Sequence, residues 1–138
     1  MKKLLVLLFV CVSTLAFWSC ASDNSPKGVA AKAIECIKDK DYTGYVDLMY
    51  FNKNTREKPD FEEGKKQYAT MLEGKVSKEF EKKEGIKSYE ILSEEIAEDG
   101  ESAVVKFKLE FGNGETNDNE TMKMRKGEDG KWLLDAGK

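Results

Sequence analysis

The residues of this 138-residue chain best suited to covalent chemistry are its three cysteines, Cys11, Cys20 and Cys36. The chain contains no histidine. Histidine is the usual general base near neutral pH, so its absence excludes Ser-His-Asp catalysis, Cys-His catalysis and zinc sites built from imidazole. The thiols are the side chains suited to covalent attachment, and the surroundings of each cysteine indicate what its thiol can do.

Cys20 follows a short hydrophobic segment at the start of the chain. Lys2 and Lys3 precede an uninterrupted apolar run of nine residues at positions 4–12. A membrane-spanning helix needs roughly 20 apolar residues, and a core helix carries a polar face that this run lacks. The charged start and the short apolar run are typical of a secretory signal peptide.

The residues before Cys20 predict how this signal is cut. In Ala16-Phe17-Trp18-Ser19-Cys20 a small residue directly precedes the cysteine. The segment resembles a lipobox, which is cleaved after a lipid is attached to the cysteine sulfur. Phe17 and Trp18 depart from the common pattern, a looseness that lipoproteins of the Bacteroidetes tolerate. We expect residues 1–19 to be removed and Cys20 to be lipidated, and two or more acyl chains give stable membrane anchoring.

The domain organisation follows from that cut. Residues 20–25 are expected to be the lipidated cysteine and a short polar tether, and residues 26–138 a single α+β domain. Cys36 then has no disulfide partner. It lies on the apolar stripe of a predicted helix, where cysteine usually acts as a small buried hydrophobe. The expected location is the cell envelope, with the chain lipid-anchored at the outer membrane, on its periplasmic face or at the cell surface.

Charge and length limit the partners. Without residues 1–19 the chain keeps 119 residues, enough for a hydrophobic core. Its 21 basic residues then stand against 26 acidic ones, a net charge near −5. The charges are interleaved and form no basic patch with aromatic residues, so nucleic acid is not an expected partner. The sequence predicts no cofactor and no metal site.

The apolar residues in the first half of the mature chain recur with the period of an α-helix. Ser25 is a suitable N-cap and Pro26 a suitable first helical residue. Apolar residues then recur on one side of the helical wheel as far as Ile37, which predicts a helix of roughly four turns. The charged residues of this segment, Glu35 among them, are expected on the opposite side.

Two further helices are expected before the pattern changes. The first runs from Asp41 to Tyr50 and is weakened by Gly44. A polar loop without any element is predicted at 52–59. The last helix is expected from 60 to 84, with Asp60 as its N-cap and Gly85 as its stop.

After Gly85 the apolar residues alternate with polar ones, which is the period of β-strands. Turn residues separate four such segments, predicted as strands at 87–96, 102–111, 115–126 and 131–135. The alternation implies one buried and one wet sheet face, and the helices must cover the buried face. No acidic residue falls among the positions expected to face inward.

Three segments carry a resemblance to a known superfamily: Ser-Pro-Lys-Gly-Val-Ala at 25–30, Lys-Asp-Tyr-Thr-Gly-Tyr at 40–45 and Asp-Gly-Lys-Trp-Leu-Leu at 129–134. Together with the order of helices and strands, they make the chain similar to the nuclear transport factor 2-like, or cystatin-like, superfamily. The closest resemblance is to small Bacteroidetes lipoproteins with a lumazine-binding-like domain of unknown function. This resemblance implies a cone of three N-terminal helices packed on a curved, four-stranded antiparallel meander.

The resemblance also implies a cavity between the sheet and the helices. Cyclases and isomerases of the superfamily place an aspartate with a histidine or tyrosine there. The candidates to line such a cavity in this chain are Tyr42, Tyr45, Tyr68, Phe107, Leu109, Met122, Met124 and Trp132. An apolar set of this kind is also what a closed core requires, and tyrosines often bury the ring and leave the hydroxyl wet.

Three functions are compatible with these observations. The first is a membrane-anchored, non-catalytic module that binds a small apolar ligand or another envelope protein. The second is an isomerase or cyclase that uses a buried carboxylate and a tyrosine, which needs an acid pointing into a cavity. The third is an accessory role, as an immunity or inhibitor protein, which would show an exposed apolar patch.

Overall fold

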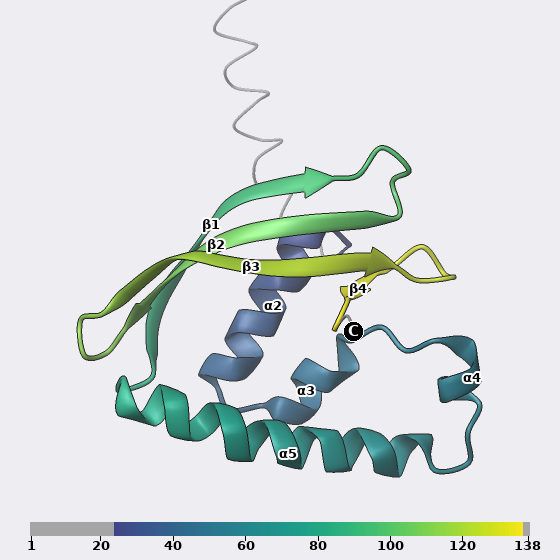
Figure 1. Cartoon of the computed structure of the whole chain (residues 1–138), viewed down its shortest axis with the longest axis horizontal. Helices are drawn as coiled ribbons and strands as arrows, with labels where there is room; N and C mark the ends of the chain where they lie inside the picture. The colour runs from purple at the N-terminus through teal and green to yellow at the C-terminus, as the bar shows by residue number, and fades with distance from the viewer. Residues whose placement is uncertain (1–23, 137–138) are drawn as a thin grey trace, which may run out of the picture.

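The chain folds into helices followed by an antiparallel sheet. The computed structural model describes residues 24–136, so the predicted signal peptide and Cys20 lie outside the described residues. In Figure 1 the sheet forms one layer, α5 runs along the opposite side, and α2 and α3 lie between them. The elements, in chain order, are α2 (Pro26–Lys38), α3 (Tyr42–Asp47), α4 (Lys53–Arg56), α5 (Phe61–Lys82), β1 (Ile86–Ile96), β2 (Ser102–Phe111), β3 (Thr116–Lys126) and β4 (Trp132–Leu134).

The first helix, α2, begins as its sequence predicts. The Ser25 hydroxyl accepts a hydrogen bond from the Gly28 N–H at 3.0 Å, and Pro26 occupies the first turn, where no intrahelical N–H bond is needed. A second acceptor meets the same helix end from the sheet, because the Lys27 N–H donates to the Glu94 carboxylate at 2.9 Å. A carboxylate is favoured there by the positive end of the helix dipole.

The second helix, α3, depends on the glycine expected to weaken it. The Asp41 carboxylate caps α3 and accepts from the Gly44 N–H at 2.9 Å. A Cβ atom at position 44 would lie 2.3 Å from an Asp41 carboxylate oxygen. Gly44 therefore lets the capping side chain approach the helix end.

The helices differ from the sequence-based expectation in three places. Helix α3 ends at Asp47 rather than Tyr50. The segment 52–59 contains the one-turn helix α4, because the Asn52 side chain caps it and accepts from the Thr55 N–H at 2.8 Å. Asp60 makes no capping bond to α5, which ends at Lys82 rather than Glu84. Glu84 and Gly85 take positive φ angles of 62° and 76° and turn the chain into β1.

The sheet is an antiparallel meander in the order β1-β2-β3-β4. The chain after α3 extends it, since the Tyr50 N–H donates to the Leu134 carbonyl and the Leu134 N–H to the Leu48 carbonyl, both at 2.7 Å. The predicted α+β class, with helices preceding a four-stranded meander, is confirmed. Among residues 24–136, no helix has the length and apolar character needed to cross a membrane.

The core lies where the helices cover the sheet. Every second residue of β2 from Ala103 to Phe111 is buried, as the alternation predicts. Helix α2 packs Val29, Ala30, Ala33 and Ile34 against this face. Burying one Val, Leu, Ile or Phe side chain stabilises a fold by about 1.5–3 kcal/mol, so this contact contributes much of the stability.

Register shifts bend the two strands that flank β2. On β1 the partner of Ile91 is Phe107 and that of Ser93 is Lys106, so Leu92 is an extra residue. The alternation of β1 reverses at that point. Beyond it, Glu94 pairs with the buried Val105, which brings its carboxylate to the start of α2. A bulge of this kind also increases the curvature of the sheet.

Candidate functional site

The side chains predicted to line a cavity lie in the apolar core. Tyr42, Met124 and Trp132 are buried in one hydrophobic cluster, and Tyr45, Tyr68 and Met122 pack against it while half-buried. Phe107 and Leu109 belong to a second cluster, which Met122 also contacts. Tyr42 and Met124 each border a surface hollow as well. A ligand cavity lined by the whole set remains a prediction.

The Tyr45 hydroxyl remains protonated near neutral pH. Burial raises the pKa of Tyr45 above its ordinary value of 10.0, and the nearby Tyr68 adds to the shift. A tyrosine with a raised pKa donates a hydrogen bond and does not act as a base. Tyr45 is therefore suited to hold a polar group of a ligand rather than to remove a proton from it.

Two polar residues of β3 share the helix-covered face of the sheet. Glu120 pairs across the sheet with the buried Phe107, and Asn117 pairs with the buried Leu109. Residues directly opposite each other point to the same face. The expectation that no acid lies at inward positions is therefore wrong. A register shift between Phe107 and Leu109 sets two β3 residues against the single residue Lys108, so β3 has one extra residue, and this shift places Asn117 and Glu120 on one side.

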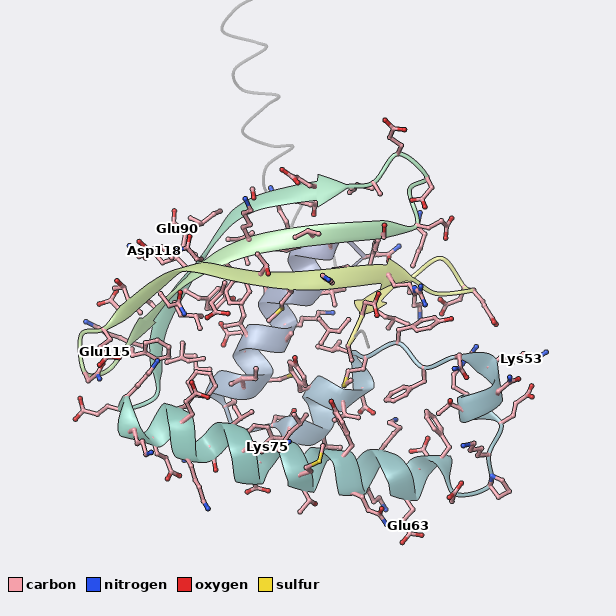
Figure 2. All side chains as sticks on the ribbon, viewed as in Figure 1. Lys53, Glu63, Lys75, Glu90, Glu115 and Asp118 are labelled. Atoms are coloured by element: carbon pink, nitrogen blue, oxygen red, sulfur yellow. The ribbon has the colours of Figure 1, made fainter. Side chains whose placement is uncertain are left out.

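These two residues also contact each other. The Asn117 amide donates a hydrogen bond to the Glu120 carboxylate, and both side chains are half-buried. Figure 2 shows the neighbouring Asp118 on the outer side of the sheet, near Glu90. Seven consecutive polar residues at 115–121 interrupt the apolar alternation, and that run is the one sequence signal of the bulge.

A second acid reaches the same face from α2. The Tyr89 hydroxyl on β1 donates a hydrogen bond to Glu35; burial first, then this bond and the Glu35 charge, raises the pKa of Tyr89. Glu35 is half-buried, although the helical wheel places it on the solvent side. Tyr89 pairs with Leu109, which pairs with Asn117. We call Glu35, Tyr89, Asn117 and Glu120 the polar rim.

The polar rim can accept and donate hydrogen bonds but lies at the edge of the core. Within residues 24–136, no charged or amide side chain is buried. A carboxyl group that acts as a general acid usually lies in a dry, apolar pocket, and the two rim carboxylates are partly open to water. No group of three His, Cys, Asp or Glu residues in the described part of the chain is arranged to hold a metal ion.

Cys36 is half-buried rather than fully buried as expected. Burial raises the pKa of its thiol, and the negative charges of Asp41, Asp39, Asp47 and Glu35 raise it further. The thiolate is the reactive form of cysteine. Cys36 therefore remains a protonated, weakly nucleophilic thiol near neutral pH.

The fold holds the chain from Asn24 onward. The Trp132 N–H donates to the Asn24 side chain at 3.4 Å, next to the Ser25 cap. Asn24 and Ser25, which fall in the predicted tether, therefore make bonds to the domain.

Comparison with known proteins identifies the fold. No protein-family model matches the chain, and no curated protein matches it. Among solved structures, a Campylobacter jejuni protein that carries the provisional name of an NTF2-like transpeptidase superposes with a TM-score of 0.61. The fold is NTF2-like. The match covers 82% of this chain and 100% of the other at 16% identity, so the NTF2-like likeness confirms the predicted fold and leaves the activity open.

Proposed function

We propose that the protein is a lipid-anchored envelope protein whose NTF2-like domain binds a ligand or a partner without catalysing a reaction. One observation carries the non-catalytic part of this proposal. The buried side chains between sheet and helices are apolar, and no charged or amide side chain among residues 24–136 is buried. A general acid or base with a strongly shifted pKa requires such burial.

The anchoring part rests on the signal-like segment and the cysteine that follows it. Asn24 already bonds to Trp132, so three residues separate it from Cys20 and the chain makes four residue steps between them. Four extended residues reach about 14 Å at most. The beginning of α2 would then lie close to the bilayer surface, and the end of α2 would point away from it. The expected location is the outer membrane of the cell envelope.

Metabolic labelling with a radioactive fatty acid tests the anchor. The full chain should incorporate label and sediment with membranes, whereas Cys20→Ala should lose the label and remain as an unprocessed or soluble protein. Cys11→Ala and Cys36→Ala are matched controls that should both stay labelled. Unchanged membrane retention of Cys20→Ala, or label on Cys36, would contradict the proposal.

Affinity capture tests the binding part. The lipidated protein would be purified from envelopes in mild detergent, beside Cys20→Ala from the same cells. We expect a protein or small molecule that co-purifies in a fixed molar ratio with the lipidated form. Recovery of bare protein at all detergent concentrations would contradict the binding role.

An enzyme of isomerase or cyclase type is the second candidate. Its supporting observation is the hydrogen-bonded pair of Glu35 and Tyr89 beside Glu120. The name of the Campylobacter neighbour suggests acyl transfer, but the raised pKa of Cys36 gives a thiol mechanism little support.

Proton exchange separates the two candidates. The full chain would be mixed with a model β,γ-unsaturated ketone in heavy water, and deuterium uptake followed by NMR. A binding protein should leave the rate at the buffer value. A faster rate that Glu35→Gln and Tyr89→Phe both abolish would establish the enzyme instead.

A further inference from the structure

A surface hollow lies at the end of α2 that points away from Asn24. It has a volume of about 280 Å³ and is bounded by the end of α2, the residues that lead into α3, the last turns of α5 and the start of β1. We call it the far-end pocket. Ligand sites for drug-sized molecules occupy roughly 300–1,000 Å³, so the far-end pocket fits a small ligand.

The walls of the far-end pocket are held by backbone bonds. Glu84, at the end of α5, lies against Gly112, where an added Cβ would be 2.4 Å from the Glu84 carbonyl oxygen. The Gly112 N–H donates to the Gly85 carbonyl at 3.0 Å, and the Asn113 N–H to the Lys83 carbonyl at 3.1 Å. The turn between β2 and β3 therefore fixes the wall formed by Glu84 and Gly85.

Tyr42 presents an unused hydroxyl to this pocket. Its side chain is 6% exposed and its ring belongs to the core. Within the described part of the chain, its hydroxyl makes no hydrogen bond, yet no buried side-chain N or O atom there lacks a partner. The hydroxyl is therefore accessible to solvent, and Tyr42 lines the far-end pocket. Burial, followed by the charges of Glu73 and Glu81, raises the pKa of Tyr42, so the group is a hydrogen-bond donor.

The mouth of the far-end pocket carries both positively and negatively charged side chains. Lys40 and Glu81 form an ion pair at 3.8 Å. Lys38 and Glu84 also line the pocket, and among residues 24–136 neither belongs to an ion pair. One cation and one anion thus remain available at the mouth, above a floor that includes Phe80 and Ile86.

We propose that the far-end pocket binds a small zwitterion with an apolar side chain, of the α-amino acid class. The ligand carboxylate meets Lys38 and the Tyr42 hydroxyl, its ammonium group meets Glu84, and its side chain lies against Phe80 and Ile86. Hydrogen bonds that involve a charged group are the strong ones, so both ends of the ligand contribute. The inference rests on the proposed binding function and gives it a ligand class.

Calorimetric titration of the full chain in detergent with L-phenylalanine tests the ligand class. 3-Phenylpropionate lacks the ammonium group and phenethylamine lacks the carboxylate, so each should bind at least about tenfold more weakly, as expected for loss of one charge-assisted bond. Equal affinity for the three compounds, or no heat with L-phenylalanine, would overturn the proposal.

Variants test the location. Tyr42→Phe keeps the ring in the core and should weaken L-phenylalanine binding by roughly threefold to tenfold, while Lys38→Met and Glu84→Gln should each weaken it by about tenfold or more. Lys53→Met and Glu63→Gln, on α4 and the start of α5 (Figure 2), are matched charge controls and should leave binding unchanged. Tyr42→Phe that binds as well as the parent would place the ligand elsewhere and refute the site.

The same preparations keep this test separate from the proposed function. If labelling at Cys20 and a co-purifying partner are both found while L-phenylalanine fails to bind, the ligand class is wrong and the anchored binding role stands. If neither label nor partner is found, the proposed function itself fails.

Discussion

The two ends of α2 are built differently. At the beginning, Ser25, Glu94 and Asn24 accept hydrogen bonds from the N–H groups of Gly28, Lys27 and Trp132. At the end, the Tyr42 hydroxyl has no hydrogen-bond partner in the described part of the chain, and Lys38 and Glu84 join no ion pair there. The beginning of α2 therefore contributes to stability, whereas its end leaves polar groups available for a ligand.

The largest expected effect lies midway between the two ends. Ile34 is 1% exposed and packs against Phe107, Leu109 and Phe111. Ile34→Ala should lower the free energy of unfolding by about 2–5 kcal/mol, because it removes buried methylenes and leaves a cavity. Urea denaturation measures this loss, with the exposed Lys53→Ala as control. A loss below that of the cap variant described next would mean that α2 is not anchored by this contact.

A smaller effect on stability should distinguish the two ends of α2 when a serine at each end is replaced by alanine. Ser25→Ala removes the cap of α2 and should cost about 1 kcal/mol. Ser77 lines the far-end pocket from within α5. Ser77→Ala should not destabilise the fold, because alanine has a higher helix propensity than serine. We expect a lower melting temperature for Ser25→Ala alone. Equal losses would show that the far end is also built for stability.

The smallest expected effect on the free energy of unfolding can be measured only at alkaline pH. Burial raises the pKa of Tyr42 above 10.0, so above that pH the unfolded chain loses the proton while the folded chain keeps it. The unfolded state then binds fewer protons, and the free energy of unfolding falls as pH rises. Below that window the contribution is complete. Tyr42→Phe should match the parent in urea at about pH 8 and lose less stability at about pH 11; parallel losses would contradict the assigned burial.

The sequence predicts much of the fold because most elements keep one period. The alternation of β2 and the Ser25-Pro26 start of α2 depend on neighbouring residues alone, and both predictions are confirmed. Helix α4 was missed because one Asn52 capping bond offsets a polar loop-like composition.

The polar rim could not be predicted from the same periods. Its members come together through a register shift in β3 and through a contact between α2 and β1. A one-residue change of register moves every later side chain to the other face, and the polar run of β3 signals a bulge without stating at which residue the register changes. The half-buried position of Glu35 could not be predicted either, because a helical wheel describes one helix and does not include the strand that packs beside it.

The bond between Asn24 and Trp132 joins residues 108 positions apart in the chain, and β4 lies between β3 and the segment that follows α3. Contacts of such long sequence separation form late and slow the folding of a domain. The core therefore stays incomplete until the residues of β4 have been made, because Trp132 and Leu134 belong to it.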